Sequence, residues 1–264
     1  MYYHTLDPVI LQLGAFRLNW FSILILLSLL AVWILARRVA KHHRTEWAQE
    51  EINDLMILVF IGLVLGARIG YILLYTPSSL LSEPWILFML WQGGLSLHGV
   101  LVGIAVAMFL FARRSHKNVF QVAELILPLL PIVLLAIHLG DFINGDQWGR
   151  LTEQPWAVVF PRADLQPRHP VQLYQAFTQG VLLFALMWWL LLKNVHCMAL
   201  SGAFLTAFGL LDIINEFFRA PLHDLAAVAA DGLRLGQMFS LPVVLAGLIL
   251  IYLATRSEKG NSAV

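Results

Sequence analysis

The chain has 264 residues, of which 59% are hydrophobic and only 12% are charged, and its mean hydropathy is +0.77. This composition is too apolar for an ordinary soluble domain and is typical of a polytopic membrane protein. The net charge of +1 argues neither for nor against a nucleic-acid partner, but no basic cluster is interleaved with base-stacking aromatic residues, so we expect none. The single cysteine, Cys197, excludes an intrachain disulfide and a cysteine-based metal site.

Seven apolar runs are long enough to cross a bilayer as helices. They lie near residues 17–36, 54–76, 95–112, 119–139, 171–192, 198–218 and 236–255. We therefore expect an all-α integral membrane protein that forms one transmembrane domain over residues 1–264. The absence of internal repeats argues against a secondary transporter.

Two connections depart from the simple pattern of spans. Residues 77–93 contain an apolar, Trp-rich piece that is too short to span, which predicts a short helix in the membrane interface. Residues 140–170 are polar, contain three prolines and predict a long loop. Both segments fall on the side of the membrane that we predict to be outside.

The distribution of Lys and Arg predicts the orientation. Ten of these residues lie in the connections after spans 1, 3 and 5 and in the C-terminal tail, whereas six are spread over the longer connections of the other side. We therefore expect a periplasmic N-terminus and a cytoplasmic C-terminus.

Ionisable residues inside a membrane are costly and normally face a polar interior, so each is a candidate functional residue. Four spans, the second, third, fourth and sixth, place such residues, or polar neighbours, in the half of the bilayer predicted to be outer. They are Arg68, His98, His138, Asp141, Asn144, Asp146, Arg150, Asp212, Glu216 and Arg219. Convergence of this kind predicts one polar cavity rather than a set of isolated polar residues.

Glycines accompany two of these spans. Gly62, Gly66 and Gly70 follow one another at intervals of four residues, which favours close packing against another helix. Gly99 and Gly103 lie just after His98, where they either serve the same packing or leave space for a ligand around the imidazole.

Several motifs occur in register along the chain. They are "LDPVILQLGAFRLNWFSI", "LGARIGYILLY", "GGLSLHGVLVG", "GDFINGDQWGR", "RHPVQLYQ", "INEFFRAP" and "LGQMFSLP". In this order they resemble the prolipoprotein diacylglyceryl transferases of bacteria, and the resemblance covers nearly the whole chain.

The resemblance implies a seven-span enzyme of the bacterial inner (cytoplasmic) membrane, without a cofactor, that acts near the periplasmic side. It would transfer the diacylglyceryl group of phosphatidylglycerol to the lipobox cysteine thiol of a prolipoprotein and release glycerol 1-phosphate. Its partners would be the phospholipid and the prolipoprotein signal peptide. By match to the family, His98 is a candidate for proton handling. His138 is the second catalytic candidate. The substrate-binding candidates are Arg68, Tyr71, Asp141, Asn144, Asp146, Gly149, Arg150, Asp212, Glu216 and Arg219.

The sequence departs from the family pattern at several positions. The family has arginines where this chain has His138 and Asp212, asparagine in place of Asp141, glutamate in place of Asp146 and tyrosine in place of Phe21. With both new acids ionised and His138 neutral, these changes lower the charge of the region by about four units. An ionised Asp212 beside a phosphate would oppose binding.

Three functional interpretations follow. In the first, the chain is a diacylglyceryl transferase whose phosphate site is rebuilt around Arg68, Arg150, Arg219 and His138. In the second, it is a paralogue that uses another lipid head group or acceptor, and in the third it is a non-catalytic lipid-binding relative. A metal held by His98, His138, Asp141 and Asp212 is a weaker alternative, because no two of these residues have a dedicated ligand spacing.

Overall fold

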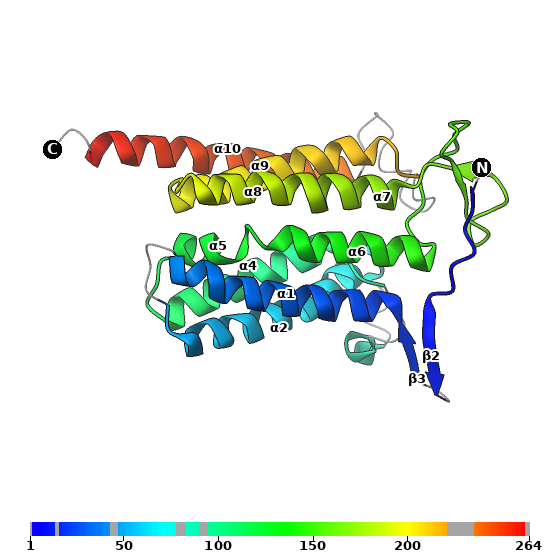
Figure 1. Ribbon diagram of the computed structural model, residues 1–264, viewed down its shortest axis with the longest axis horizontal. Coiled ribbons are helices and arrows are strands. Elements are labelled where there is room, and N and C mark those ends of the chain that lie inside the picture. Colours follow the sequence, from blue (N-terminus) through cyan, green and yellow to red (C-terminus); the bar gives the residue numbers. More distant parts are fainter. Residues whose placement is uncertain are drawn as a thin grey trace. The chain divides into compact units, whose positions relative to one another are not determined.

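The computed structural model describes residues 2–13, 16–42, 47–77, 83–89, 94–220 and 235–261, and most of these residues are helical (Figure 1). The chain divides into two compact units. The first unit combines Met1–Val32 with Ile126–Val264, and the second unit is Trp33–Leu125. Each unit is described by itself below.

Six described helices are long and apolar enough to cross a membrane, and a seventh span is formed if two shorter helices are counted together. The six are α1 (Trp20–His42), α2 (Gln49–Tyr75), α4 (Leu97–Arg114), the continuous run of α7 (Val171–Gln175), η3 (Ala176–Leu182) and α8 (Leu183–Leu192), α9 (Cys197–Glu216) and α10 (Leu235–Asn261). The two shorter helices are α5 (Val119–Ile126) and α6 (Leu130–Asn144). The predicted all-α membrane fold is confirmed, whereas the orientation of the termini stays a prediction.

The predicted span 119–139 is interrupted between α5 and α6. Pro128 has no N–H to donate and its ring clashes with the carbonyl four residues earlier, so it ends a helix. Pro131 stands in the first turn of α6, where a missing N–H costs nothing. The two prolines explain why one apolar run gives two helices.

In the second unit, α2 and α4 pack backbone to backbone. A Cβ on Gly62 or Gly66 would overlap the carbonyl oxygens of Gly103 and Gly99, and a Cβ on Gly103 would overlap the carbonyl oxygen of Gly62. The glycine spacing of residues 62–70 thus serves close helix packing, as predicted. The same packing uses Gly99 and Gly103, so these two glycines do not clear space around His98.

In the first unit, α9 packs against α10 and α6 packs against η3, as Figure 1 shows for the long pair α9 and α10. Gly202 lies against Gly247, and Gly180 of η3 lies against Leu135 of α6. The segment η3 is a π-helix inside an otherwise regular span. Such wide turns shift the side chains that follow and occur frequently at functional sites.

Short strands hold the N-terminal segment and the long loop of the first unit. The hairpin of β2 (Val9–Leu13) and β3 (Phe16–Asn19) precedes α1, although we expected residues 17–19 to begin the first span. β1 (Tyr2–Tyr3) pairs in parallel with β4 (Val158–Val159), with Tyr2 opposite Val158, and β4 pairs antiparallel with β5 (Pro167–Arg168). The loop of residues 145–170 is therefore tied to the N-terminus.

The segment predicted as an interfacial helix contains a short 3-10 helix, η1 (Pro84–Phe88). Its residues 78–82 and 90–93 lie outside the described part of the chain. Trp85 and Phe88 of η1 are strongly exposed. This exposure is what an interfacial segment needs, because apolar side chains there contact lipid.

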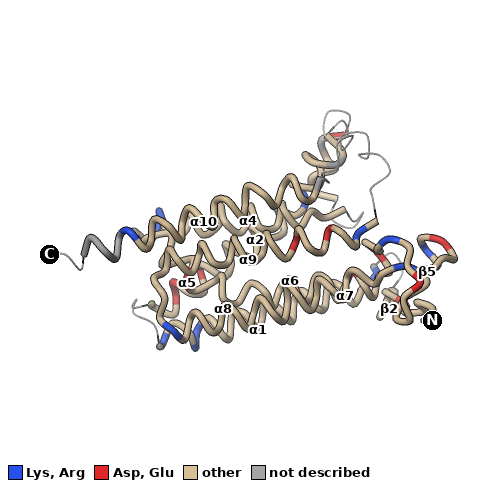
Figure 2. Tube along the Cα trace, turned by 90° about the horizontal axis from the view of Figure 1, so that it is seen from above, with Lys and Arg blue, Asp and Glu red and all other residues tan. Residues whose placement is uncertain are grey.

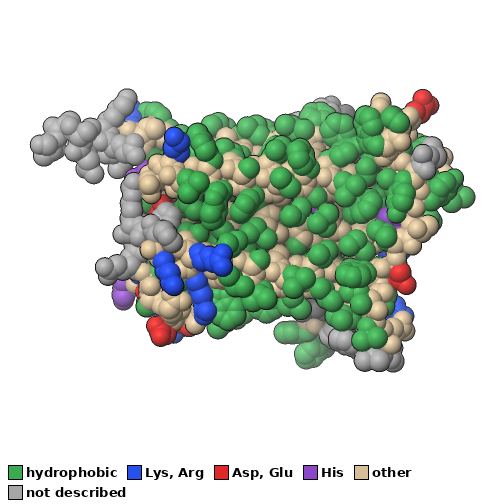
Figure 3. Space-filling model, in the orientation of Figure 1, with side chains coloured by type: hydrophobic (Ala, Val, Ile, Leu, Met, Phe, Trp, Pro, Cys, Tyr) green, Lys and Arg blue, Asp and Glu red, His purple; other side chains and the backbone are tan. Residues whose placement is uncertain are grey.

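The helix surfaces also suit a lipid environment. On the face drawn in Figure 3, hydrophobic side chains cover most of the helices. Leu65 of α2, Val102 of α4 and Leu248 of α10 are each at least half exposed. Figure 2 shows that charged residues gather toward the helix ends and loops. The acidic residues along α9 are an exception.

Candidate functional site

Three backbone segments of the first unit meet after α6. Gly145 ends α6 in the left-handed conformation with φ of 68°. The following segment lies between residues 167–169 and the end of α9: Arg150 N–H donates to the Phe218 carbonyl at 2.8 Å, and Gly149 N–H donates to the His169 carbonyl at 3.0 Å. Position 149 requires glycine, because a Cβ there would overlap the His169 carbonyl. These contacts fix the positions of the backbone atoms from which the Arg150 and Arg219 side chains extend.

A side-chain clamp supports this junction. Arg168 donates to the Gly149 carbonyl at 2.9 Å and makes a bidentate contact with Asp164, with N···O distances of 3.1 and 2.6 Å. Hydrogen bonds from Arg168 lower the pKa of the Asp164 carboxyl. The bidentate contact with Asp164 thereby orients the Arg168 guanidinium toward the Gly149 carbonyl.

The end of α9 carries an ion pair. Arg219 lies 3.4 Å from the Glu216 carboxylate, and both side chains are mostly buried. Arg219 also interacts electrostatically with Asp141 on α6, while Arg150 does so with Glu216. The acids of this region therefore share two arginines, which leaves less positive charge for a phosphate.

A chain of hydrogen bonds crosses four helical segments inside the first unit. His138 Nε2 on α6 lies 2.7 Å from Gln179 Oε1 on η3. Gln179 Nε2 donates to Asp212 Oδ1 on α9 at 3.0 Å, and Ser240 Oγ on α10 donates to Asp212 Oδ2 at 2.6 Å. All four side chains are at least 98% buried. His138 and Asp212 are thus joined through one glutamine.

A second polar group lies around the end of α6. Gln172 Nε2 on α7 donates to the Asp146 carbonyl, and Arg162 donates to the Asn144 carbonyl at 2.8 Å. The Asp146 carboxylate lies 3.9 Å from Arg162. Burial raises the pKa of the Asp146 carboxyl, and the Arg162 guanidinium partly offsets this. Asp146 is thus held at a site that disfavours its charge.

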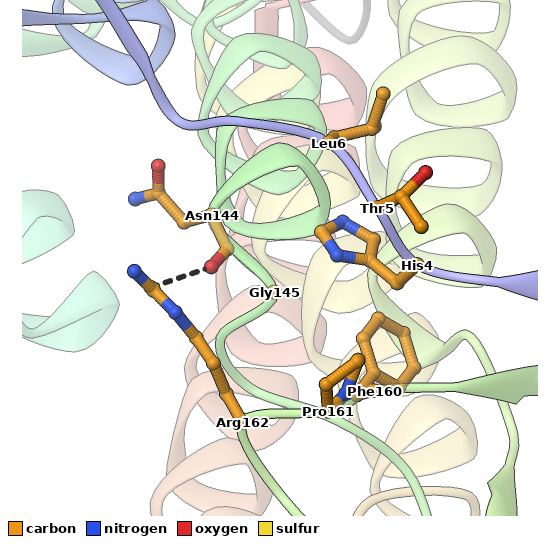
Figure 4. Close-up of a pocket in the computed structure, with 8 residues that line it drawn as sticks. All are labelled: His4, Thr5, Leu6, Asn144, Gly145, Phe160, Pro161 and Arg162. Atoms are coloured by element: carbon orange, nitrogen blue, oxygen red, sulfur yellow. Dashed lines mark hydrogen bonds between the residues drawn. The ribbon is translucent and has the colours of Figure 1, made fainter.

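A pocket of about 180 Å³ opens beside these residues. Figure 4 shows Arg162 reaching the Asn144 carbonyl on one side, with His4 and Phe160 on another. His4 Nε2 donates to the Phe142 carbonyl at 2.6 Å. The pocket therefore has a cation on one wall and aromatic rings on the other, next to the predicted site residue Asn144.

The second unit holds the remaining predicted site residues. The guanidinium of Arg68 is 98% buried and donates to the Ile86 carbonyl at 3.0 and 2.7 Å and to the Gly94 carbonyl at 3.4 Å. The Tyr71 ring packs against Gly94, whose φ of 75° suits glycine. His98 lies in the first turn of α4, which Ser96 caps. Arg68 thus holds η1 and also Gly94, which lies just before the start of α4 and four residues before His98.

No described group of three or more His, Cys, Asp or Glu side chains has an arrangement that could hold a metal ion.

Comparison with known proteins identifies the family. Residues 8–253 match the family described as "Prolipoprotein diacylglyceryl transferase". The chain belongs to this family. The phosphatidylglycerol–prolipoprotein diacylglyceryl transferase of Coxiella burnetii is 39% identical over 98% of this chain and 99% of its own length. Proteins of the same name from Oleidesulfovibrio alaskensis (41% identity; 97% and 96% coverage) and Legionella pneumophila (37%; 94% and 97%) are also similar.

The predicted site residues of this family member fall into two sets. His138, Asp141, Asn144, Asp146, Gly149, Arg150, Asp212, Glu216 and Arg219 belong to the first unit, and Arg68, Tyr71 and His98 belong to the second. Within the first unit, Gln179 hydrogen-bonds both His138 and Asp212 and so links them. The backbone of Gly149 forms an isolated antiparallel β-bridge with that of Arg219. Their roles toward a substrate stay predictions.

Three structural partners of the site were not among the predicted residues. Gln179 and Ser240 complete the hydrogen-bond chain, and Arg168 clamps Gly149. A signal for Gln179 was present, because Gln172, Gln175 and Gln179 recur at intervals of three and four within an apolar span and are fully buried. Ser240 offered no such signal, since a lone serine is common in membrane helices.

Proposed function

We propose that this protein transfers the diacylglyceryl group of phosphatidylglycerol to the lipobox cysteine thiol of prolipoproteins in the bacterial inner membrane. The cysteine sulfur forms a bond to the glyceryl carbon, the bond from that carbon to the phosphate oxygen breaks, glycerol 1-phosphate leaves, and the thiol proton passes to a base. The observation that carries the proposal is the full-length similarity to relatives named for this reaction.

The site supports the chemistry in two ways. A phosphate leaving group needs cations or N–H donors. Arg150 and Arg219 are two such cations, and their backbones belong to the junction in which Gly149 and Arg150 donate to the His169 and Phe218 carbonyls. A thiol attacks as its thiolate, so a proton acceptor must be close. We assign this role to a histidine, with His98 and His138 as the candidates.

Genetic complementation tests the proposal. A bacterium whose own transferase is depleted should regain lipoprotein maturation when it expresses this chain, and unprocessed prolipoproteins should disappear from its membranes. A variant in which both candidate histidines, His98 and His138, are replaced by alanine should abolish rescue at equal expression. Failure of the unaltered chain, when it is well expressed and inserted, would contradict the proposal.

A second candidate is transfer from a lipid with another head group. The specific observation is that His138 and Asp212 hydrogen-bond through Gln179 rather than present positive charge, at positions where the resemblance places two arginines. Converting both positions to arginine should then raise activity on phosphatidylglycerol. If the double variant shows no gain while remaining folded, specificity does not reside in these positions.

A further inference from the structure

Three buried polar groups of the first unit have their hydrogen-bond donors committed to protein acceptors. Gln172 Nε2 donates to the Asp146 carbonyl, and the Asn144 side chain hydrogen-bonds the Asp146 carboxylate. Because a carboxylate or a carbonyl only accepts, the NH₂ groups of both amides must face these partners. The oxygens Gln172 Oε1 and Asn144 Oδ1 are buried and find no donor among the described residues.

The same logic fixes the orientation of Gln179 and His138. Asp212 Oδ1 accepts from Gln179 Nε2, so Gln179 turns its NH₂ group to Asp212 and its oxygen to His138. That oxygen can only accept, and His138 must therefore carry its proton on Nε2. His138 Nδ1 is then a bare lone pair, and this atom too is buried without a partner among the described residues.

The three atoms share a chemistry, since each is a buried acceptor without a donor among the described residues. Gln172 on α7 and Asn144 both lie by Asp146, whereas His138 lies six residues before Asn144 on α6, about 9 Å along the helix axis, and pairs with Gln179 of η3. Buried polar atoms in native proteins are normally satisfied, so such atoms call for a ligand group. A negative phosphate is the wrong partner for them, because it brings further acceptors next to Asp212.

We propose that His138 Nδ1 binds a neutral hydrogen-bond donor of a substrate, a hydroxyl or a thiol, while Gln172 Oε1 and Asn144 Oδ1 offer further acceptors nearer the end of α6. Gln179 and Asp212 are positioning residues that hold the histidine in its Nε2–H form. This inference rests on the proposed function for its substrates: the head-group glycerol of the lipid carries hydroxyls, and the acceptor cysteine carries a thiol.

The assignment changes the role of the departures from the family pattern. Where two arginines would present donors to an anion, the pair of His138 and Asp212 with Gln179 presents an acceptor to a donor. If the bound donor is the thiol, Nδ1 takes its proton as the sulfur attacks, which leaves an imidazolium facing the Gln179 and Asp212 pair. If it is a hydroxyl, Nδ1 orients the lipid and no proton moves.

Histidine tautomers give a test that needs no turnover. The full chain, labelled with 15N-histidine and placed in lipid nanodiscs, should show His138 with a protonated Nε2 and a bare Nδ1 at pH 7. His138→Gln assigns the signal. Gln179→Leu should change the tautomer, whereas the matched Gln175→Leu, in the same span and equally buried, should not. A protonated Nδ1 in the unaltered chain would overturn the proposal.

Kinetics with the unaltered chain and Gln179→Leu separate the two donors. If the thiol binds, Gln179→Leu should lower kcat about 100-fold at unchanged lipid KM. If a head-group hydroxyl binds, the variant should have a higher lipid KM than the unaltered chain. With lipids that lack the head-group hydroxyls, the two proteins should have the same lipid KM. Either result supports the acceptor site, and no effect on kcat or KM would overturn it. An unaltered chain without activity would contradict the proposed function, while the tautomer result would still decide the site.

Discussion

At position 212 a carboxyl group hydrogen-bonds two other helical segments, through Gln179 Nε2 and Ser240 Oγ. A buried polar group is tolerated when such partners surround it. Asp212 therefore cannot be exchanged for an apolar residue without taking away the acceptor of Gln179 Nε2, whereas Ser240 Oγ still reaches the Gly236 carbonyl. The sequence alone indicated that Asp212 would be functional, but a cross-helix partner such as Gln179 can be found only from the packing of η3 against α9.

Asp146→Asn should raise stability while it lowers activity. Burial raises the pKa of the folded Asp146 carboxyl above its unfolded value, so its contribution to stability is present below the unfolded pKa and is lost as the pH rises through the folded pKa. At pH 7 the amide removes this cost, and we expect a melting temperature higher by about 2 °C. Glu153→Gln, an exposed change in the same loop, is the control. A lower melting temperature for Asp146→Asn at pH 7 would contradict the burial argument.

Asp164→Asn should loosen the junction around Gly149. The folded pKa of Asp164 is lowered by Arg168, so its stabilisation is present above the unfolded pKa of about 4 and is lost as the pH falls through the folded pKa. The contact is partly exposed, and its loss should cost less than about 1 kcal/mol. Hydrogen exchange of residues 148–151 should be faster in the variant at pH 7. Unchanged exchange there would show that Arg168 does not hold the junction.

At the scale of elements, the close approach of α2 and α4 depends on glycine. Gly66→Ala places a Cβ where the Gly99 carbonyl oxygen lies, so the helices must separate. We expect a loss of stability of about 2 kcal/mol, measured by thermal unfolding in detergent. Leu65→Ala, one residue earlier on a side chain that is 51% exposed, should have a much smaller effect. Equal effects of both changes would argue against backbone contact.

The helices could be predicted from the sequence because length and hydropathy decide what crosses a membrane. The span predicted at 198–218 corresponds to Cys197–Glu216, and that at 171–192 to the continuous run from α7 to α8. The hairpin of β2 and β3 was not predicted, since its apolar residues run directly into α1. The π-helix η3 was not predicted either, because it results from packing against α6 rather than from a local sequence signal.

At the scale of the molecule, the predicted orientation can be tested with cysteine labelling. Cys197→Ser removes the single native cysteine, and Glu153→Cys then places a new one in the exposed loop of residues 145–170. In intact spheroplasts a membrane-impermeant thiol reagent should label Glu153→Cys. A cysteine introduced at Lys193, between α8 and α9, should be labelled only after lysis. The reverse pattern would invert the proposed orientation.

The central claim is that the chain transfers a diacylglyceryl group to a thiol. The most direct measurement uses the purified full chain in nanodiscs with phosphatidylglycerol, a lipobox peptide and mass spectrometry of the peptide. We predict a peptide whose mass has increased by one diacylglyceryl group on its cysteine, together with release of glycerol 1-phosphate, and neither product when His98 and His138 are both replaced by alanine. An unmodified peptide, in a preparation that is folded and binds the lipid, would contradict the claim.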